Sequence, residues 1–273
     1  MLRPENILSA LGVTQVTIAS QDYWDVVLEP NPEQCHVYHP RRSGGHGIVD
    51  WLMGHHEPPK IHYNQAQLLG EGRMKVQLDQ VSQIRGTNGQ PWFTVVSLED
   101  IAPNAIAAYV QPPRRAVLLL RDPFNTLASR LAIVHKPGAS EGWPDTNRNF
   151  PTLWKQYARE FLNPHFLPHA VRVNFNRWYV NRDYRREIAA QLGWTFNDRG
   201  FGSKEGWRFS LGSSFGETDP KNLHLFSRWR HFEGNAEYVA CFDDEMRDLS
   251  QRIFDFAPPL KRSAPPCRQG AEP

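Results

Sequence analysis

Ala116–Leu120 (A-V-L-L-L) is a run of apolar residues without the polar alternation of a strand that has one wet face. Such a run is typical of a parallel strand that is covered on both faces of its sheet. The segment Asn125–Val134 has the pattern of a helix, and Pro123 stands where the first helical turn tolerates proline. A buried strand followed at once by a helix favours a layered α/β domain.

The same order of elements recurs along the chain. Further strands are predicted from β-branched, aromatic or apolar runs at Tyr23–Leu28, Cys35–His39, Trp92–Leu98 and Ala170–Phe175, with another candidate at Val13–Ile18. Helices are predicted at Ile48–Met53, Pro151–Leu162, Asp183–Leu192 and Glu237–Phe256. We therefore predict an α/β fold, a single-domain P-loop-like parallel sheet flanked by helices. The domain is expected to span residues 1–256, with a recognisable core at 35–256 and a disordered tail at 257–273.

Bulk composition excludes several classes of protein. The 31 Lys and Arg residues nearly balance 29 Asp and Glu residues, which gives no basic excess of the kind that nucleic-acid binders carry. The three cysteines are far apart and form neither a disulfide framework nor a metal-ligand pair. With no apolar run long enough for a signal peptide or a membrane helix, we expect a cytoplasmic protein with no membrane partner. The sequence does not fix the oligomeric state, and a homodimer remains open.

A glycine-rich loop lies between the strand ending at His39 and the helix starting near Ile48. Glycines there let the backbone approach an anion, and the helix start adds unsatisfied N–H groups with partial positive charge. The loop residues predicted to bind the anion are Arg41, Arg42, Ser43, Gly44, Gly45, His46 and Gly47. The Walker spacing and its lysine are absent. A tight turn without a ligand is the simpler alternative for the glycines, and the arginine pair favours anion binding.

The second motif begins where the strand Ala116–Leu120 ends, at Arg121-Asp122-Pro123, and Ser129 follows Arg121 eight residues later. With the R-S-G-x-H loop at Arg42–His46, it resembles the PAPS-dependent sulfotransferase family, in particular a bacterial small-molecule branch. PAPS is 3'-phosphoadenosine-5'-phosphosulfate. The resemblance implies the sulfotransferase fold, PAPS as donor with 3',5'-ADP as product, and no metal. It implies that the loop holds the 5'-phosphosulfate and that Arg121 and Ser129 hold the 3'-phosphate.

Two further donor contacts are less defined. The tryptophan that stacks on adenine in other family members is missing at Gly47, so Trp51, Phe175 or an aromatic residue of the 201–229 segment is the candidate. The family's late R-K-G element has Lys221, Arg228 and Arg230 as its candidates here.

The general base is predicted by position. Many members of this family carry a histidine where Glu99 stands here, and some members that modify glycans use a glutamate. A carboxylate in a partly dry pocket gains proton affinity, so Glu99 is the first candidate for the base. His46 is the second and His62 the third, each with the simpler alternative of a loop histidine; Glu99 also fits a solvated strand end. Arg42 keeps its charge and is expected to act electrostatically.

The acceptor is expected to be a small soluble molecule with a hydroxyl or an amine, a polar natural product or alkaloid of secondary metabolism. Residues 55–72, 143–157 and 201–229 are expected to line its pocket, with Glu71, Asp145 and Glu205 as candidate partners for a cationic acceptor. A saccharide or lipid-linked glycan acceptor is the alternative within the family. A P-loop nucleotide kinase and a non-catalytic nucleotide-binding protein are the alternatives outside it.

Overall fold

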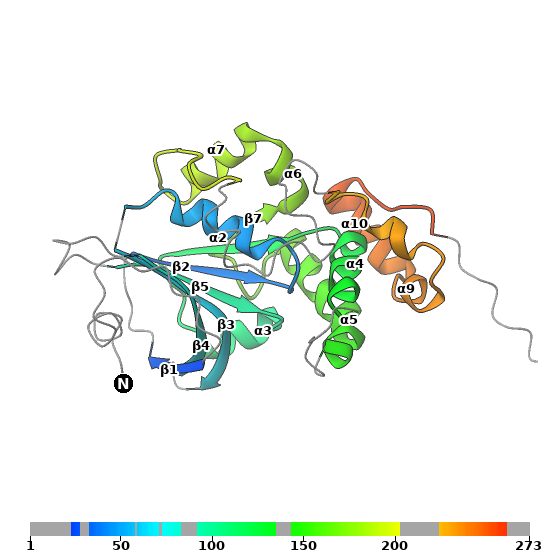
Figure 1. Ribbon diagram of the computed structural model, residues 1–273, viewed down its shortest axis with the longest axis horizontal. Helices are drawn as coiled ribbons and strands as arrows, with labels where there is room; N and C mark the ends of the chain where they lie inside the picture. Colours follow the sequence, from blue (N-terminus) through cyan, green and yellow to red (C-terminus); the bar gives the residue numbers. More distant parts are fainter. Residues whose placement is uncertain are drawn as a thin grey trace, which may run out of the picture.

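The computed structural model describes residues 23–27, 33–57, 59–70, 73–82, 92–134, 143–202 and 224–260. Within these ranges the strands form one seven-stranded sheet in the order β1-β4-β3-β5-β2-β6-β7 (Figure 1). The strands are β1 Tyr23–Val27, β2 Gln34–His39, β3 Lys60–Gly70, β4 Arg73–Ser82, β5 Phe93–Glu99, β6 Arg115–Leu120 and β7 Val171–Asn174. The candidate strand at Val13–Ile18 lies outside the described residues.

Five neighbouring strands, β3, β5, β2, β6 and β7, pair in parallel, which confirms the predicted parallel sheet. The sheet continues beyond β3 through the antiparallel strands β4 and β1. Sequence analysis did not predict the β3–β4 hairpin, because polar residues interrupt its apolar positions and three register shifts break the pairing of the two strands.

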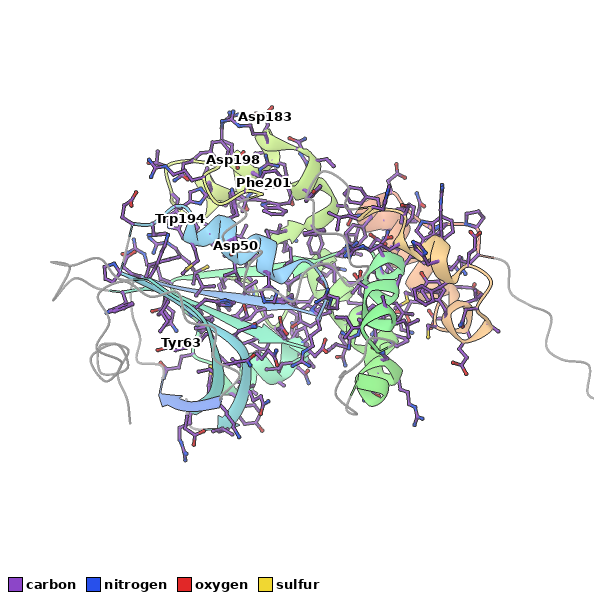
Figure 2. The ribbon with its side chains drawn as sticks, in the orientation of Figure 1. Asp50, Tyr63, Asp183, Trp194, Asp198 and Phe201 are labelled. Atoms are coloured by element: carbon purple, nitrogen blue, oxygen red, sulfur yellow. The ribbon has the colours of Figure 1, made fainter. Side chains whose placement is uncertain are left out.

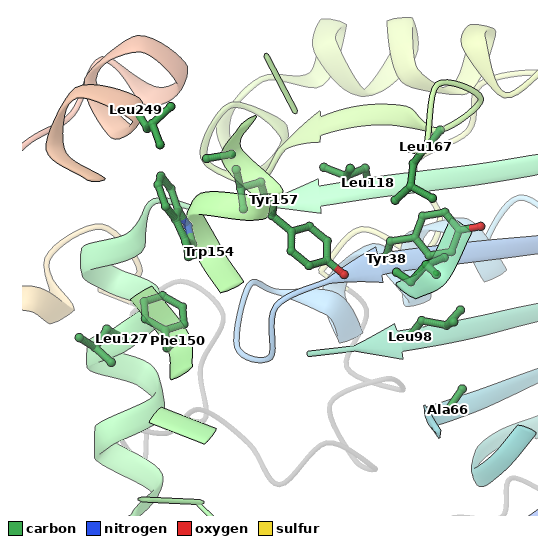
Figure 3. Close-up of a cluster of buried hydrophobic side chains, with 14 of the residues drawn as sticks. Tyr38, Ala66, Leu98, Leu118, Leu127, Phe150, Trp154, Tyr157, Leu167 and Leu249 are labelled. Atoms are coloured by element: carbon green, nitrogen blue, oxygen red, sulfur yellow. The ribbon is translucent and has the colours of Figure 1, made fainter. Parts of the chain in front are cut away.

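Helices cover both faces of the sheet. They are α2 Gly45–Met53, α3 Pro103–Tyr109, α4 Pro123–Val134, α5 Trp143–Leu162, α6 Phe175–Val180, α7 Arg182–Gln191, the 3-10 helix η2 Arg228–Phe232, α9 Ala236–Ala240 and α10 Asp244–Phe254. On one face, alternate residues of β2, β5 and β6 pack against α2, α6 and α7. On the other face they pack against α3, α4, α5 and α10, in the cluster around Trp154 and Tyr157 (Figure 3). Two covered faces explain the continuous apolar run of β6.

The C-terminal end of the chain differs from its prediction. The single helix expected at Glu237–Phe256 is two helices. The first ends at Ala240, and Asp243 caps the second by accepting a hydrogen bond from the Met246 amide at 2.8 Å. Of the predicted tail, residues 257–260 are described; Leu260 is buried and packs on the core, and residues 261–273 lie outside the described residues.

The parallel pairing aligns the ends of four strands. His39, Glu99, Leu120 and Asn174 end β2, β5, β6 and β7 at the carboxyl edge of the sheet. Ligands of open α/β sheets bind at this edge. In the part of the chain that the structure describes, no helix combines the length and apolar character needed to cross a membrane.

Candidate functional site

The glycine-rich loop joins β2 to α2 in a tight turn, as predicted. The Ser43 amide donates to the Pro40 carbonyl at 3.2 Å, and the Ile48 amide donates to the Gly44 carbonyl, also at 3.2 Å. Two residues adopt left-handed backbone conformations, Gly44 at φ 90° and Arg42 at φ 68°. The turn therefore lies directly at the N-terminus of α2, where free amides and the helix dipole attract anions.

Two of the glycines are required by close neighbours. A Cβ atom on Gly44 would lie 2.1 Å from the ring of Phe175, and a Cβ atom on Gly45 would lie 2.3 Å from the ring of His39. Gly47 differs, because its Cβ atom would meet Trp178 at an ordinary 3.7 Å. The loop therefore packs without side chains against the ends of β2 and β7.

Arg121, Ser129 and Arg228 come together beside this loop. Arg121 leaves the end of β6, is 2% exposed, and its Nη1 lies 3.5 Å from Ser129 Oγ and 3.3 Å from the Arg42 carbonyl. Its Nη2 donates to the Leu225 carbonyl. From η2, Arg228 donates through Nη1 to Ser129 Oγ at 2.9 Å. The predicted pair Arg121 and Ser129 is thus adjacent, and Arg228 joins it.

Buried polar atoms at this edge that have no hydrogen-bond partner among the described residues include Ser43 Oγ, Arg121 Nε and His39 Nε2. Buried polar atoms of this kind normally have a partner, and their presence beside a loop of backbone amides fits an anionic ligand. We call the set Arg42, Ser43, Arg121, Ser129 and Arg228 the anion cluster.

The arginines of the anion cluster repel one another. Burial, together with the charges of Arg228 and Arg42, lowers the pKa of Arg121 to about 9, although Asp122 opposes the shift. Burial and the charges of Arg228 and Arg130 lower the pKa of Arg42 to about 10, which Glu99 opposes. Both groups remain charged at neutral pH, so an anion bound among them would relieve desolvation and repulsion together.

A second set of charged residues also contacts the loop. Arg130 is fully buried and donates from Nη1 and Nη2 to the two carboxylate oxygens of Asp100, each at 2.9 Å. Arg41 donates from Nε to Glu99 Oε2 at 3.2 Å, and from its backbone amide to Asp100 Oδ1 at 2.8 Å. We call Arg41, Arg130, Glu99 and Asp100 the paired network. Arg41, expected to bind the anion, is thus placed beside Glu99.

The three base candidates occupy different surroundings. Glu99 ends β5, and its side chain is 10% exposed. His46 is partly buried in the first turn of α2. The assignment of His62 to an exposed loop is wrong: it lies in β3, is 1% exposed, and its Nε2 lies 2.8 Å from Ser97 Oγ. The ring of His46 lies 6.3 Å from the ring of His62, centroid to centroid.

Among the aromatic candidates, Phe175 lies at the site and Trp51 does not. Phe175 follows β7, packs on Gly44, and has the Arg121 guanidinium 5.4 Å from its ring centroid. Trp51 is fully buried in the core under α7, where its indole N–H donates to Asp198 at 3.1 Å. Figure 2 shows Asp198 with Phe201 in the turns that follow α7. Adenine stacking by Trp51 is therefore excluded by its burial.

Other predicted residues contribute less to the site or lie outside the description. Arg230 is exposed, and its guanidinium lies 5.6 Å from the ring centroid of Trp229. Lys221, Glu71 and Glu205 lie outside the described residues, as does the side chain of Asp145. Within the described ranges, no group of three or more His, Cys, Asp or Glu side chains could hold a metal ion.

Sequence reasoning missed His39 and Arg130. His39 ends β2 directly before the loop, and Arg130 follows Ser129 in α4. The signal for His39 was its place at the end of a parallel strand, where functional side chains gather. Arg130 carried no local signal, because its partner Asp100 is 30 residues away in the sequence.

No protein-family model and no curated protein matches the chain. Solved structures similar to it include a mouse sulfotransferase complexed with PAP, at 12% identity and a TM-score of 0.49, covering 84% of this chain and 91% of that one. The sulfotransferase domain of the Synechococcus PCC 7002 olefin synthase aligns at 12% identity and a TM-score of 0.49 over 85% of this chain and 98% of that domain. The sulfotransferase domain of the curacin biosynthetic pathway aligns at 13% identity and a TM-score of 0.47, covering 82% and 98%. Identities and TM-scores this low carry no argument about function.

Proposed function

We propose that this chain is a sulfotransferase that moves the sulfuryl group of PAPS to a hydroxyl or amine of a small polar acceptor. The observation that carries the proposal is the anion cluster, in which Arg121, Ser129 and Arg228 stand beside the Ser43 loop. A donor with phosphate groups at both the 3' and the 5' position of its ribose needs two neighbouring anion sites. The loop at the start of α2 and the Arg121–Ser129–Arg228 group supply two such places at one sheet edge.

In this proposal the residues of the anion cluster bind and orient the donor. Arg121, Arg228 and Ser129 hold the 3'-phosphate, and the Ser43 hydroxyl with the loop amides holds the 5'-phosphosulfate. PAPS supplies an activated sulfuryl group whose leaving group is the 5'-phosphate. Arg42 provides fixed positive charge next to the loop, so it stabilises developing negative charge and does not move a proton. Phe175, packed between Gly44 and Arg121, is the candidate surface for the adenine.

Glu99 is the proposed general base. It lies at the carboxyl end of β5, on the same sheet edge as the loop, and burial of most of its side chain limits competition by water. Positioned proton transfer of this kind contributes roughly a hundredfold to ten-thousandfold to a rate. We expect the Glu99→Gln variant, which keeps the shape of the side chain, to lose activity within that range while binding 3',5'-ADP as wild type does.

The test of donor binding compares two isomers that carry the same number of phosphate groups, placed differently on the ribose. Isothermal titration calorimetry with 3',5'-ADP and with 5'-ADP should give tighter binding of 3',5'-ADP by at least about tenfold, because only that isomer places a phosphate at each of two sites. Equal affinities would remove the 3'-phosphate assignment. Tighter binding of ATP with Mg²⁺ than of 3',5'-ADP would favour a nucleotide kinase instead.

Turnover separates an enzyme from a non-catalytic binding protein. Labelled PAPS would be offered with phenols, aliphatic alcohols and amines, and in parallel with saccharides and a lipid-linked glycan. Transfer to a small acceptor supports the proposal. Transfer only to the saccharides or the lipid-linked glycan supports the other acceptor class. Binding of 3',5'-ADP without transfer to any acceptor would contradict the assignment as an enzyme.

A further inference from the structure

His39 lies beside the proposed base. The parallel register of β2 and β5 pairs His39 with Glu99, and His39 Nε2 lies 3.6 Å from Glu99 Oε1. His39 is 1% exposed, and the Glu99 side chain is 10% exposed. The two side chains therefore form a buried pair at the sheet edge, close to the start of α2.

Gly45 fixes the place of the His39 ring. A Cβ atom at position 45 would lie 2.3 Å from Cε1 and 2.6 Å from Nε2 of His39. The imidazole thus occupies the space that any side chain at position 45 would need. The ring has no room to move toward α2, so Nε2 stays directed at Glu99.

The other ring nitrogen determines the tautomer. His39 Nδ1 lies 3.1 Å from the Pro40 carbonyl oxygen. A carbonyl oxygen only accepts hydrogen bonds, so Nδ1 carries a proton. In a neutral ring Nε2 then presents a lone pair to the Glu99 carboxylate. His39 Nε2 and Glu99 Oε1 are then two acceptor atoms that face each other. A proton that binds to either of them removes this unfavourable contact, because it can form a hydrogen bond to the other.

The surrounding charges act on both members of the pair. Burial lowers the pKa of His39, and His46 on α2 adds to that effect, whereas Glu99, Asp100 and the Pro40 carbonyl raise the pKa. Glu99 Oε2 accepts a hydrogen bond from Arg41 Nε at 3.2 Å, and Glu99 also interacts electrostatically with Arg42. The phenol of Tyr157 also interacts electrostatically with Glu99. Burial is the largest of these influences on the pKa of His39, so the net effect favours the neutral ring.

We propose that His39 is a positioning residue that acts through Glu99: Nε2 shares with Oε1 the proton that Glu99 takes from the acceptor. This inference rests on the proposed function. The acceptor's O–H or N–H bond breaks as its heteroatom forms a bond to sulfur. The bond from sulfur to the 5'-phosphate oxygen breaks, and its electron pair stays on the product 3',5'-ADP. The proton moves to the His39–Glu99 pair and is released to water after the product leaves.

The direct test follows the titration of the pair in the full chain without substrate. With ¹³C- and ¹⁵N-labelled histidine and glutamate, NMR should show the His39 ring and the Glu99 carboxyl changing with one common midpoint. In Glu99→Gln the His39 midpoint should fall by at least about one pH unit, because the carboxylate that favours its proton is gone. Separate midpoints in wild type, or an unchanged His39 midpoint in Glu99→Gln, would overturn the proposal. The exposed His169 serves as an internal reference and should keep its midpoint.

The kinetic test uses His39→Gln and the pH profile of kcat/KM with PAPS. Protonation of the pair removes the base, so activity falls on the acid side with the midpoint of the pair. Without the His39 lone pair, a proton on Glu99 no longer has a second acceptor beside it. The acid limb should then move about one unit lower, and the plateau should fall roughly tenfold. A purely structural role would lower the plateau and leave the acid limb in place, which would contradict the inference.

The two tests separate this inference from the proposed function. If PAPS is not turned over but His39 and Glu99 titrate together, sulfuryl transfer fails and proton sharing stands. If PAPS is turned over and the two groups titrate separately, the function stands and the role of His39 fails. The NMR test on Glu99→Gln needs no His39 variant, so it still decides the question should His39→Gln not fold.

Discussion

Arg41 and Arg42 are neighbours in the chain, yet they belong to two differently built charge clusters. In the paired network, Arg41 contacts Glu99 and Arg130 contacts Asp100, so each guanidinium has a carboxylate. In the anion cluster, the hydrogen bonds described for Arg121 go to Ser129 Oγ and to the carbonyls of Arg42 and Leu225. These oxygens satisfy donors without neutralising charge.

This difference indicates that the paired network stabilises the fold, whereas the anion cluster is suited to bind a ligand. A buried arginine whose carboxylate is part of the chain is balanced in the empty protein, and removing it leaves a buried charge unpaired. A buried arginine whose described hydrogen bonds go to neutral oxygens is compensated less directly, by the charge of a neighbouring carboxylate such as Asp122, and a bound anion would add to that compensation. Mutations in the paired network should therefore lower the free energy of unfolding, whereas mutations in the anion cluster should mainly lower the affinity for the ligand.

The largest effect is expected from Arg130→Met. The substitution leaves the Asp100 carboxylate in place with its main counter-charge gone, and a broken buried pair typically destabilises by about 3–5 kcal/mol. Urea unfolding measures the change. The matched control is Arg159→Met, which breaks an exposed pair with Glu245 and should change the free energy of unfolding by no more than about 1 kcal/mol. Similar losses in both variants would remove the distinction between the two clusters.

Next comes Arg121→Gln, the corresponding change in the anion cluster. Its affinity for 3',5'-ADP should fall about a hundredfold, equivalent to about 2.7 kcal/mol, because a charged phosphate contact is lost. The ligand-free protein should lose much less stability than it does in Arg130→Met, since one of three mutually repelling charges disappears while buried Asp122 loses part of its compensation. Calorimetry and urea unfolding check the two parts. The exposed Arg199→Gln is the control, and a large stability loss in Arg121→Gln would place Arg121 in the scaffold.

Gly45→Ala probes the contact between the loop and His39, the neighbour of Glu99 in the paired network. The added Cβ atom would overlap the His39 ring, and overpacking of this kind destabilises by about 1–3 kcal/mol. Gly47→Ala lies in the same helix and meets Trp178 at an ordinary distance, so it should be neutral or stabilising by up to about 1 kcal/mol. Thermal unfolding of the two variants side by side gives the answer. An equal response would mean that His39 is not fixed by the loop.

The smallest effect is expected from Ser129→Ala, which removes the neutral oxygen between Arg121 and Arg228. Loss of one hydroxyl contact typically costs about 1 kcal/mol, so 3',5'-ADP should bind about fivefold more weakly. The same calorimetric titration measures it. A loss as large as that of Arg121→Gln would show that Ser129 organises the cluster and does not merely contact the ligand.

Local patterns were enough to predict the central strands and the proximity of Arg121 to Ser129. The apolar run of β6 and the eight-residue spacing of Arg121 and Ser129 are both visible in a short stretch of sequence, without information on the rest of the chain. What could not be predicted depends on pairing between distant segments. His39 meets Glu99 only because β2 and β5 pair in one register, and Arg130 meets Asp100 across 30 residues. Trp51 shows the opposite error. It is close to the loop in sequence and was therefore a candidate for adenine stacking, but its side chain is fully buried in the core.

Arg42 has φ 68°, a left-handed conformation that glycine would adopt with less strain. A residue other than glycine in this region stores about 1 kcal/mol or more of backbone strain. Selection for a durable fold alone would favour glycine at position 42, and selection for a fixed charge at the loop favours arginine. The turn is therefore a place where thermostability and activity are opposed, and consensus or stability-guided engineering of this chain should leave position 42 untouched.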